Sequence, residues 1–149
     1  MGTFFDVHDR TCLAGVRILI VDDDDDVRDA MISLLRLFGA DVCAVEGAGV
    51  ARAVLAAWAF DVLLSDIEMP GESGYDLIRT VRHSVRTCDL PAAAITGRAS
   101  PGDCCRALAA GFDLVVAKPP AVEVLVETVR SLAARQPRPE RRRSAAALL

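Results

Sequence analysis

Short apolar runs alternate five times with amphipathic stretches along this chain, and this alternation limits the folds that the chain can adopt. The runs are rich in Val, Ile, Leu and Ala and have the length of buried strands. Between them, apolar residues recur every three or four positions, which is the period of a helix with one buried face. Parallel strands need crossover connections of about a dozen residues, usually helices. We therefore expect an α/β fold in which helices cover both faces of a parallel sheet.

The predicted elements follow one another without an internal repeat. Strands are expected at residues 16–21, 41–45, 62–65, 92–95 and 114–117. Helices are expected at residues 25–38, 49–58, 75–83, 101–110 and 121–134. The sequence thus predicts one domain over residues 16–134. A leader of uncertain structure (1–15) precedes it, and a flexible basic tail (135–149) follows it.

Composition and charge exclude several classes of function. The chain has 149 residues, of which 52% are hydrophobic and 26% charged, as in globular proteins. Its net charge of −4 does not favour direct binding to nucleic acid. No apolar run reaches the ~18 residues of a membrane span, and the N-terminus lacks a signal pattern, so we expect a cytoplasmic location. The five cysteines lack metal-site spacing and are interpreted as reduced thiols.

Polar side chains follow four of the predicted strands, at the sheet edge where open parallel sheets bind their ligands. Asp22 and Asp23 follow the first strand, Asp66 the third, Thr96 the fourth and Lys118 the fifth. Because three neighbouring carboxylates repel one another, we expect a hard cation such as Mg²⁺ (or Mn²⁺) to join them. Together with Lys118 and Thr96, the cation would bind the oxygens of a transferring phosphoryl group, with Asp66 as the nucleophile.

With their neighbours, these residues resemble the receiver domains of response regulators in two-component systems. The resemblance rests on residues 18–24, 61–71 and 95–97 and on Lys118 followed by Pro119, in order and with family-like spacing. It implies a flavodoxin-like (βα)5 fold with strand order 2-1-3-4-5. It also implies a phosphoprotein that changes its binding of partners.

The resemblance implies that Asp66 accepts a phosphoryl group from a histidine kinase or a histidine phosphotransfer protein. It assigns Mg²⁺ to the side chains of Asp22, Asp23 and Asp66 and to the backbone carbonyl of Glu68. The protein would catalyse its own phosphorylation and dephosphorylation, and it would not be a turnover enzyme.

The resemblance gives further residues a role in switching. It implies that the Thr96 hydroxyl moves toward the phosphate, that Lys118 contacts the phosphate, and that a cis peptide bond precedes Pro119. It also implies a possible dimer face on the fourth helix, fifth strand and fifth helix. The extra aspartates at 24–26 are interpreted as acid at a helix start, where the helix dipole favours it.

Three features depart from the family pattern. Val115 stands where receiver domains usually carry an aromatic residue. Glu68 and Arg98 each lie two positions after a site residue, and we predict that they form an ion pair or steer water, and so tune the lifetime of the phosphate. The helix at 101–110 is rich in Ala and Leu, which we interpret chiefly as a buried side.

Two other functions compete with a phosphorylated receiver. One is a pseudo-receiver that binds proteins without phosphorylation, which the valine at 115 favours and the complete acidic site opposes. The other is a metal-dependent phosphohydrolase of the haloacid-dehalogenase type, which would need an aspartate at Glu68. Few residues follow 134, so we expect the output to depend on partners, whether the chain is a stand-alone receiver or part of a hybrid kinase.

Overall fold

The five predicted strands form a single parallel sheet. In the computed structural model, which describes residues 9–135, the strands are β1 (Arg17–Val21), β2 (Asp41–Val45), β3 (Val62–Ser65), β4 (Ala92–Thr96) and β5 (Leu114–Ala117). Their order in the sheet is β2-β1-β3-β4-β5, and each neighbouring pair is parallel. This confirms the flavodoxin-like order that the resemblance implied.

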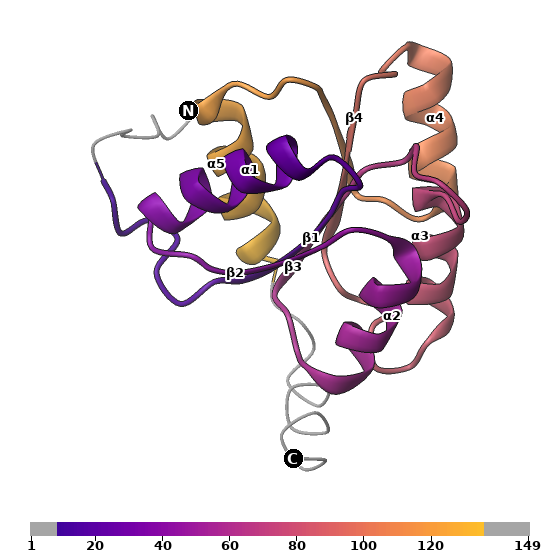
Figure 1. Ribbon diagram of the computed structural model, residues 1–149, viewed down its shortest axis with the longest axis horizontal. Coiled ribbons are helices and arrows are strands. Elements are labelled where there is room, and N and C mark those ends of the chain that lie inside the picture. The colour runs from indigo at the N-terminus through magenta and orange to yellow at the C-terminus, as the bar shows by residue number, and fades with distance from the viewer. Residues whose placement is uncertain (1–8, 136–149) are drawn as a thin grey trace.

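Helices cover both faces of the sheet. They are α1 (Asp25–Leu37), α2 (Ala48–Ala57), α3 (Gly74–His83), α4 (Pro101–Ala110) and α5 (Val122–Ala133). In Figure 1, α1 and α5 lie on one side of the sheet and α2, α3 and α4 on the other. Within residues 9–135, no helix has both the length and the apolar character that a membrane span requires.

Each face of the sheet has its own hydrophobic core. Leu19 and Leu63 point into the core under α2 and α3, whereas Ile18 and Leu64 point into the core under α1 and α5. Successive strand residues therefore alternate between two cores, and all four of these side chains are fully buried. Burial on both faces explains why the strands read as continuous apolar runs.

Residues 9–15 fall in the predicted leader, yet they contact this core through Leu13 and Cys12. The Leu13 side chain is fully buried in the core under α1 and α5. Its N–H donates to the carbonyl of Phe38 at 3.0 Å, and the Arg10 guanidinium lies over the Phe38 ring. The Val16 N–H closes a turn onto the Leu13 carbonyl, so β1 begins one residue later than predicted. Residues 1–8 and the predicted tail from 136 lie outside the described residues.

Helix α4 contributes little to the core. Its one buried residue is Ala107, whereas α3 and α5 bury five residues each. Leu108 is 49% exposed. The interpretation of the Ala- and Leu-rich helix as chiefly a buried side is therefore wrong. Its small side chains reduce the area that the helix can bury, and most of the helix surface faces solvent.

Candidate functional site

Three carboxylates meet where β1 and β3 end. Val21 and Ser65 are register partners in these neighbouring strands, so Asp22 and Asp66 emerge side by side. One oxygen from each of Asp22, Asp23 and Asp66 lies within 4.8 Å of the others. Asp22 and Asp66 are buried, and Asp23 is exposed. The set of oxygen ligands fits a hard cation such as Mg²⁺, and the exposed Asp23 leaves room for the waters that this ion retains.

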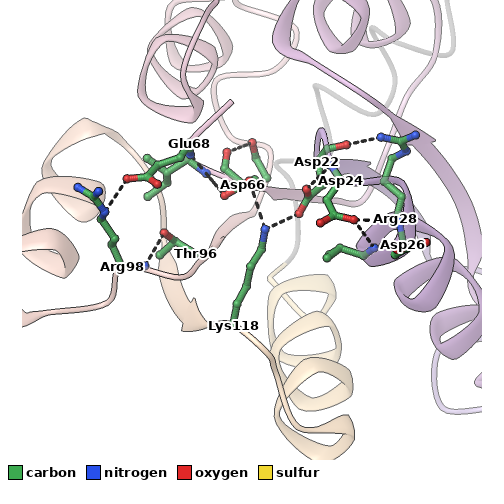
Figure 2. Close-up of polar contacts among 12 residues, drawn as sticks. Asp22, Asp24, Asp26, Arg28, Asp66, Glu68, Thr96, Arg98 and Lys118 are labelled. Carbon is green, nitrogen blue, oxygen red and sulfur yellow. Dashed lines mark hydrogen bonds and ion pairs between the residues drawn. The ribbon is translucent and has the colours of Figure 1, made fainter. Parts of the chain in front are cut away.

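Lys118 joins the two buried carboxylates. Its Nζ lies 2.6 Å from Asp22 Oδ2 and 3.2 Å from Asp66 Oδ2, and Figure 2 shows the ammonium between the two side chains. The Lys118 N–H donates to the Thr96 carbonyl at 2.9 Å, which fixes its backbone against β4. The bond from Lys118 to Pro119 is cis, as predicted.

The electrostatics of the site favour bound protons. Burial raises the pKa of the Asp66 carboxyl; the Lys118 ammonium opposes this shift, and the charge of Asp22 adds to it. Burial would lower the pKa of Lys118, but the hydrogen bond to Asp22 and the charges of both aspartates outweigh it and raise the pKa. Lys118 therefore stays charged, yet it does not fully offset the cost of burying the Asp66 charge beside Asp22.

The backbone after β3 holds Asp66 in place. Asp66 Oδ1 accepts hydrogen bonds from the N–H groups of Ile67 at 2.8 Å and Glu68 at 3.3 Å. The Gly74 N–H donates to the Ile67 carbonyl at 2.8 Å, so the start of α3 lies directly behind the site. A Cβ at Gly74 would lie 2.2 Å from the Asp66 carbonyl oxygen, so no larger residue fits without moving this backbone.

Thr96 lies at the end of β4 with its side chain 1% exposed. Its hydroxyl accepts a hydrogen bond from the Arg98 N–H at 3.1 Å, within its own loop. The structure thus places Thr96 at the predicted edge of the sheet, and its hydroxyl is hydrogen-bonded within its own loop. The predicted movement of this hydroxyl toward a phosphate would require that bond to break.

Glu68 and Arg98 form the predicted ion pair. Arg98 Nε lies 2.9 Å from Glu68 Oε1, and both side chains are mostly exposed. Figure 2 shows the Glu68 carboxylate turned toward Arg98, on the side of Asp66 away from Asp22. Its carboxylate is not part of the three-carboxylate cluster, so the predicted role of Glu68 in metal binding depends on its backbone carbonyl alone.

Arg28 also supports the site, a role that was not predicted from the sequence. Its guanidinium donates to the Asp22 carbonyl at 2.7 Å and pairs with Asp25. Asp24 caps α1 by accepting the N–H of Asp26, which confirms the interpretation of the extra aspartates. The i, i+3 spacing of Asp25 and Arg28 was the signal available in the sequence.

Comparisons with known proteins agree with this geometry. The sequence model described as the response regulator receiver domain matches residues 18–130. The chain is 34% identical over 118 residues to the chemotaxis protein CheY of Pseudomonas aeruginosa, covering 78% of this chain and 95% of that protein. It is also 34% identical over 135 residues to the sensor protein GacS of Pseudomonas syringae, covering 87% of this chain but 15% of that protein.

Solved structures give the same result. The chemotaxis protein CheY4 of Vibrio cholerae superposes with a TM-score of 0.76 and 27% sequence identity, over 80% of this chain and 99% of that one. The sheet order, the acidic cluster with its lysine and these similarities all agree. The chain belongs to the response regulator receiver domain family of two-component signalling.

Proposed function

We propose that Asp66 accepts a phosphoryl group from the phosphohistidine of a kinase or a phosphotransfer protein, in a Mg²⁺-dependent reaction. The observation that carries the proposal is the placement of Asp66. Its carboxylate is buried, has Lys118 Nζ at 3.2 Å, and lies beside the carboxylates of Asp22 and Asp23. This arrangement suits a nucleophile that must receive a strongly anionic group.

Mg²⁺ would be held by the side chains of Asp22, Asp23 and Asp66 and by the Glu68 carbonyl, with Mn²⁺ as a substitute. When bound, the ion neutralises charge on the carboxylates and on the incoming phosphoryl oxygens. The three carboxylates offer oxygen ligands close enough together for one ion.

The chain's own residues position the reacting groups. Asp66 Oδ1 is held by the N–H groups of Ile67 and Glu68, so Oδ2, which lies beside Lys118 Nζ, is the oxygen that attacks phosphorus. A P–O bond forms as the P–N bond to the donor imidazole breaks, and the imidazole takes up a proton as it leaves. Lys118 binds a phosphoryl oxygen, and the Thr96 hydroxyl binds another after leaving the Arg98 N–H.

The phosphorylated form would bind its partners differently from the unphosphorylated form. Each molecule takes up one phosphoryl group and releases it by hydrolysis, so the protein is a switch and not a turnover enzyme.

The surface of α4, β5 and α5 is the proposed dimer face. The exposed side chains of Leu108 and Val124 support it, and light scattering before and after phosphorylation tests it.

The function is tested by incubating the full chain with Mg²⁺ and a small acyl phosphate and measuring its intact mass. We expect the mass of one phosphoryl group to be added to the wild type and to Asp41→Asn, which alters an exposed aspartate on β2. Asp66→Asn should gain nothing. A wild type that gains no phosphoryl group supports the pseudo-receiver, and continuous consumption of the donor at enzyme-like rates supports a phosphohydrolase.

A further inference from the structure

Few side chains hold helix α4 against the domain. Ala107 is its one buried residue, and Leu108 is half exposed. A contact with α3 comes from Arg106, whose guanidinium carbon lies 4.4 Å from the centre of the Tyr75 ring. An arginine over an aromatic face is attractive, and here it links two neighbouring helices. In a helix with so little buried area, this contact adds an attachment to α3.

The Tyr75 side of this contact is rigid. Tyr75 is 8% exposed and follows Gly74, whose backbone lies against the backbone of Asp66 and Ile67. The Gly74 N–H donates to the Ile67 carbonyl. The ring is therefore held close to the phosphoacceptor segment. A relative motion of the two helices would displace Arg106 and leave the ring in place.

An open cleft connects this contact with Thr96. The cleft has a volume of about 560 Å³, and its lining includes Thr96, Arg98, Tyr75 and Arg106. The Thr96 hydroxyl holds the Arg98 N–H, and the loop of Arg98 leads within three residues to the first turn of α4. The Thr96 hydroxyl is thus linked through this short loop to the helix that carries Arg106.

On the face of the sheet that α3 and α4 cover, strands β4 and β5 offer no large side chain for this coupling. Val115 of β5 is the register partner of Ala94 of β4, and both side chains belong to the core on this face. Ile95, the large side chain of β4, belongs to the core on the other face. The large aromatic residue beside the cleft is Tyr75, which comes from α3.

We infer that Tyr75 and Arg106 are positioning residues that hold α4 against α3 in the unphosphorylated protein, and that phosphorylation of Asp66 releases them. The inference rests on the proposed function. When the Thr96 hydroxyl leaves the Arg98 N–H for a phosphoryl oxygen, the loop at 97–100 shifts. The first turn of α4 follows it, and Arg106 withdraws from the Tyr75 ring.

The chain contains one tyrosine, so 3-fluorotyrosine labelling places a single fluorine probe at Tyr75. Fluorine NMR spectra are recorded with Mg²⁺, with and without a small acyl phosphate, and the intact mass is measured on the same samples. We expect the resonance to move as the phosphoryl group is gained. Full phosphorylation with an unmoved resonance contradicts the inference alone, whereas a missing phosphoryl group contradicts the proposed function and the inference together.

Hydrogen exchange of the α4 amides separates coupling from a merely structural role. Phosphorylation should raise α4 exchange in the wild type by about two- to fivefold, as expected for loss of one exposed cation–π contact. Arg106→Gln should show this raised exchange before phosphorylation and little further rise after it. Arg106→Lys should restore the wild-type response, and Arg79→Gln, an exposed arginine of α3, is the matched control.

The same measurement is made on the Tyr75 side. Tyr75→Phe keeps the aromatic face and should respond as the wild type does, whereas Tyr75→Leu should behave as Arg106→Gln does. If phosphorylation raises α4 exchange equally in Arg106→Gln, Tyr75→Leu and the wild type, the contact does not couple the site to α4.

Discussion

At the scale of single residues, Asp66 lies where its own charge is unfavourable. The side chain is buried beside Asp22, and the resulting rise in its pKa shows that Lys118 compensates this charge only in part. A nucleophile must nevertheless be ionised, so the site depends on further positive charge to keep Asp66 reactive. This requirement gives the acidic cluster a physical reason to bind a divalent cation.

Asp66→Asn should therefore stabilise the metal-free protein. Because the folded pKa of Asp66 is raised, stability that is present below about pH 4 is lost as the pH rises through that folded pKa. In a chelating buffer, the melting temperature of the variant should exceed that of the wild type by about 2–5 °C at pH 7. This is the shift expected when the free energy of unfolding rises by ~1 kcal/mol.

The difference in melting temperature between Asp66→Asn and the wild type should shrink toward zero at pH 4. Mg²⁺ should stabilise the wild type more than the variant. Asp41→Asn, at an exposed position, should change the melting temperature little. A variant that melts below the wild type at pH 7 in chelator would show that the contact with Lys118 outweighs the cost of burial.

The ion pair between Glu68 and Arg98 is a second feature that single residues determine. Breaking it by Glu68→Ala or Arg98→Ala should open the approach of water to a phosphorylated Asp66. An exposed pair is worth about 0.2–1 kcal/mol, so autodephosphorylation should accelerate by up to about fivefold. The decay of phosphoprotein by intact mass measures this, with Arg79→Ala, which breaks a remote surface pair, as control. Unchanged decay in both variants would mean that the pair does not regulate the phosphate.

At the scale of the elements, most of the fold follows from local sequence. The bounds of all five strands and all five helices agree with the prediction to within one residue at each end. Apolar runs are local signals, and so are the Ser100 cap and the Gly111 stop that bound α4. Contacts between distant segments carry no such signal. The stacking of Arg106 on Tyr75 and the burial of Leu13 depend on tertiary packing, and sequence reasoning missed both.

Arg82 also makes contacts between segments that are distant in the sequence. Its guanidinium donates to the carbonyls of Cys88, Leu90 and Gly111 and pairs with Asp113 at 3.1 Å. One side chain thus joins the end of α3 to the start of β4 and to the loop before β5. At Gly111 the φ angle is +130°, and a Cβ there would lie 2.9 Å from the Arg82 side chain, so this close approach requires glycine.

Arg82→Ala should destabilise the domain by about 2–3 kcal/mol, because three carbonyls lose the Arg82 donor and the Asp113 carboxylate loses one of its partners. Urea unfolding with a two-state analysis measures this. Arg130→Ala is the matched control, since its pair with Glu127 lies within α5, and it should cost less than ~1 kcal/mol. Equal costs for the two variants would contradict the role of Arg82 as a link between elements.

At the scale of the whole molecule, two hydrophobic cores flank one sheet, and the site lies at the edge where both end. The core under α1 and α5 is completed by Leu13, from a segment that precedes β1. The segment contributes to stability even though it lies outside the alternating strands and helices. The sequence pattern could not assign it, because a single leucine in a turn has no periodicity.

Leu13→Ala should destabilise the protein by about 2–5 kcal/mol, the range for a fully buried leucine. Urea unfolding of the full chain measures this cost. Val85→Ala is the control, because Val85 is 81% exposed and its truncation should cost less than ~0.5 kcal/mol. A cost for Leu13→Ala as small as that of the control would place the segment outside the cooperative fold.

We propose that Asp66, and no other carboxylate of the cluster, receives the phosphoryl group. To test this assignment, the full chain is phosphorylated with Mg²⁺ and an acyl phosphate, the product is reduced with borohydride, and its peptides are sequenced by mass spectrometry. Borohydride reduces an aspartyl phosphate to homoserine and so marks the modified position. We expect homoserine at position 66 alone. Homoserine at position 22 or 23, or none in a protein that binds Mg²⁺, would contradict the account.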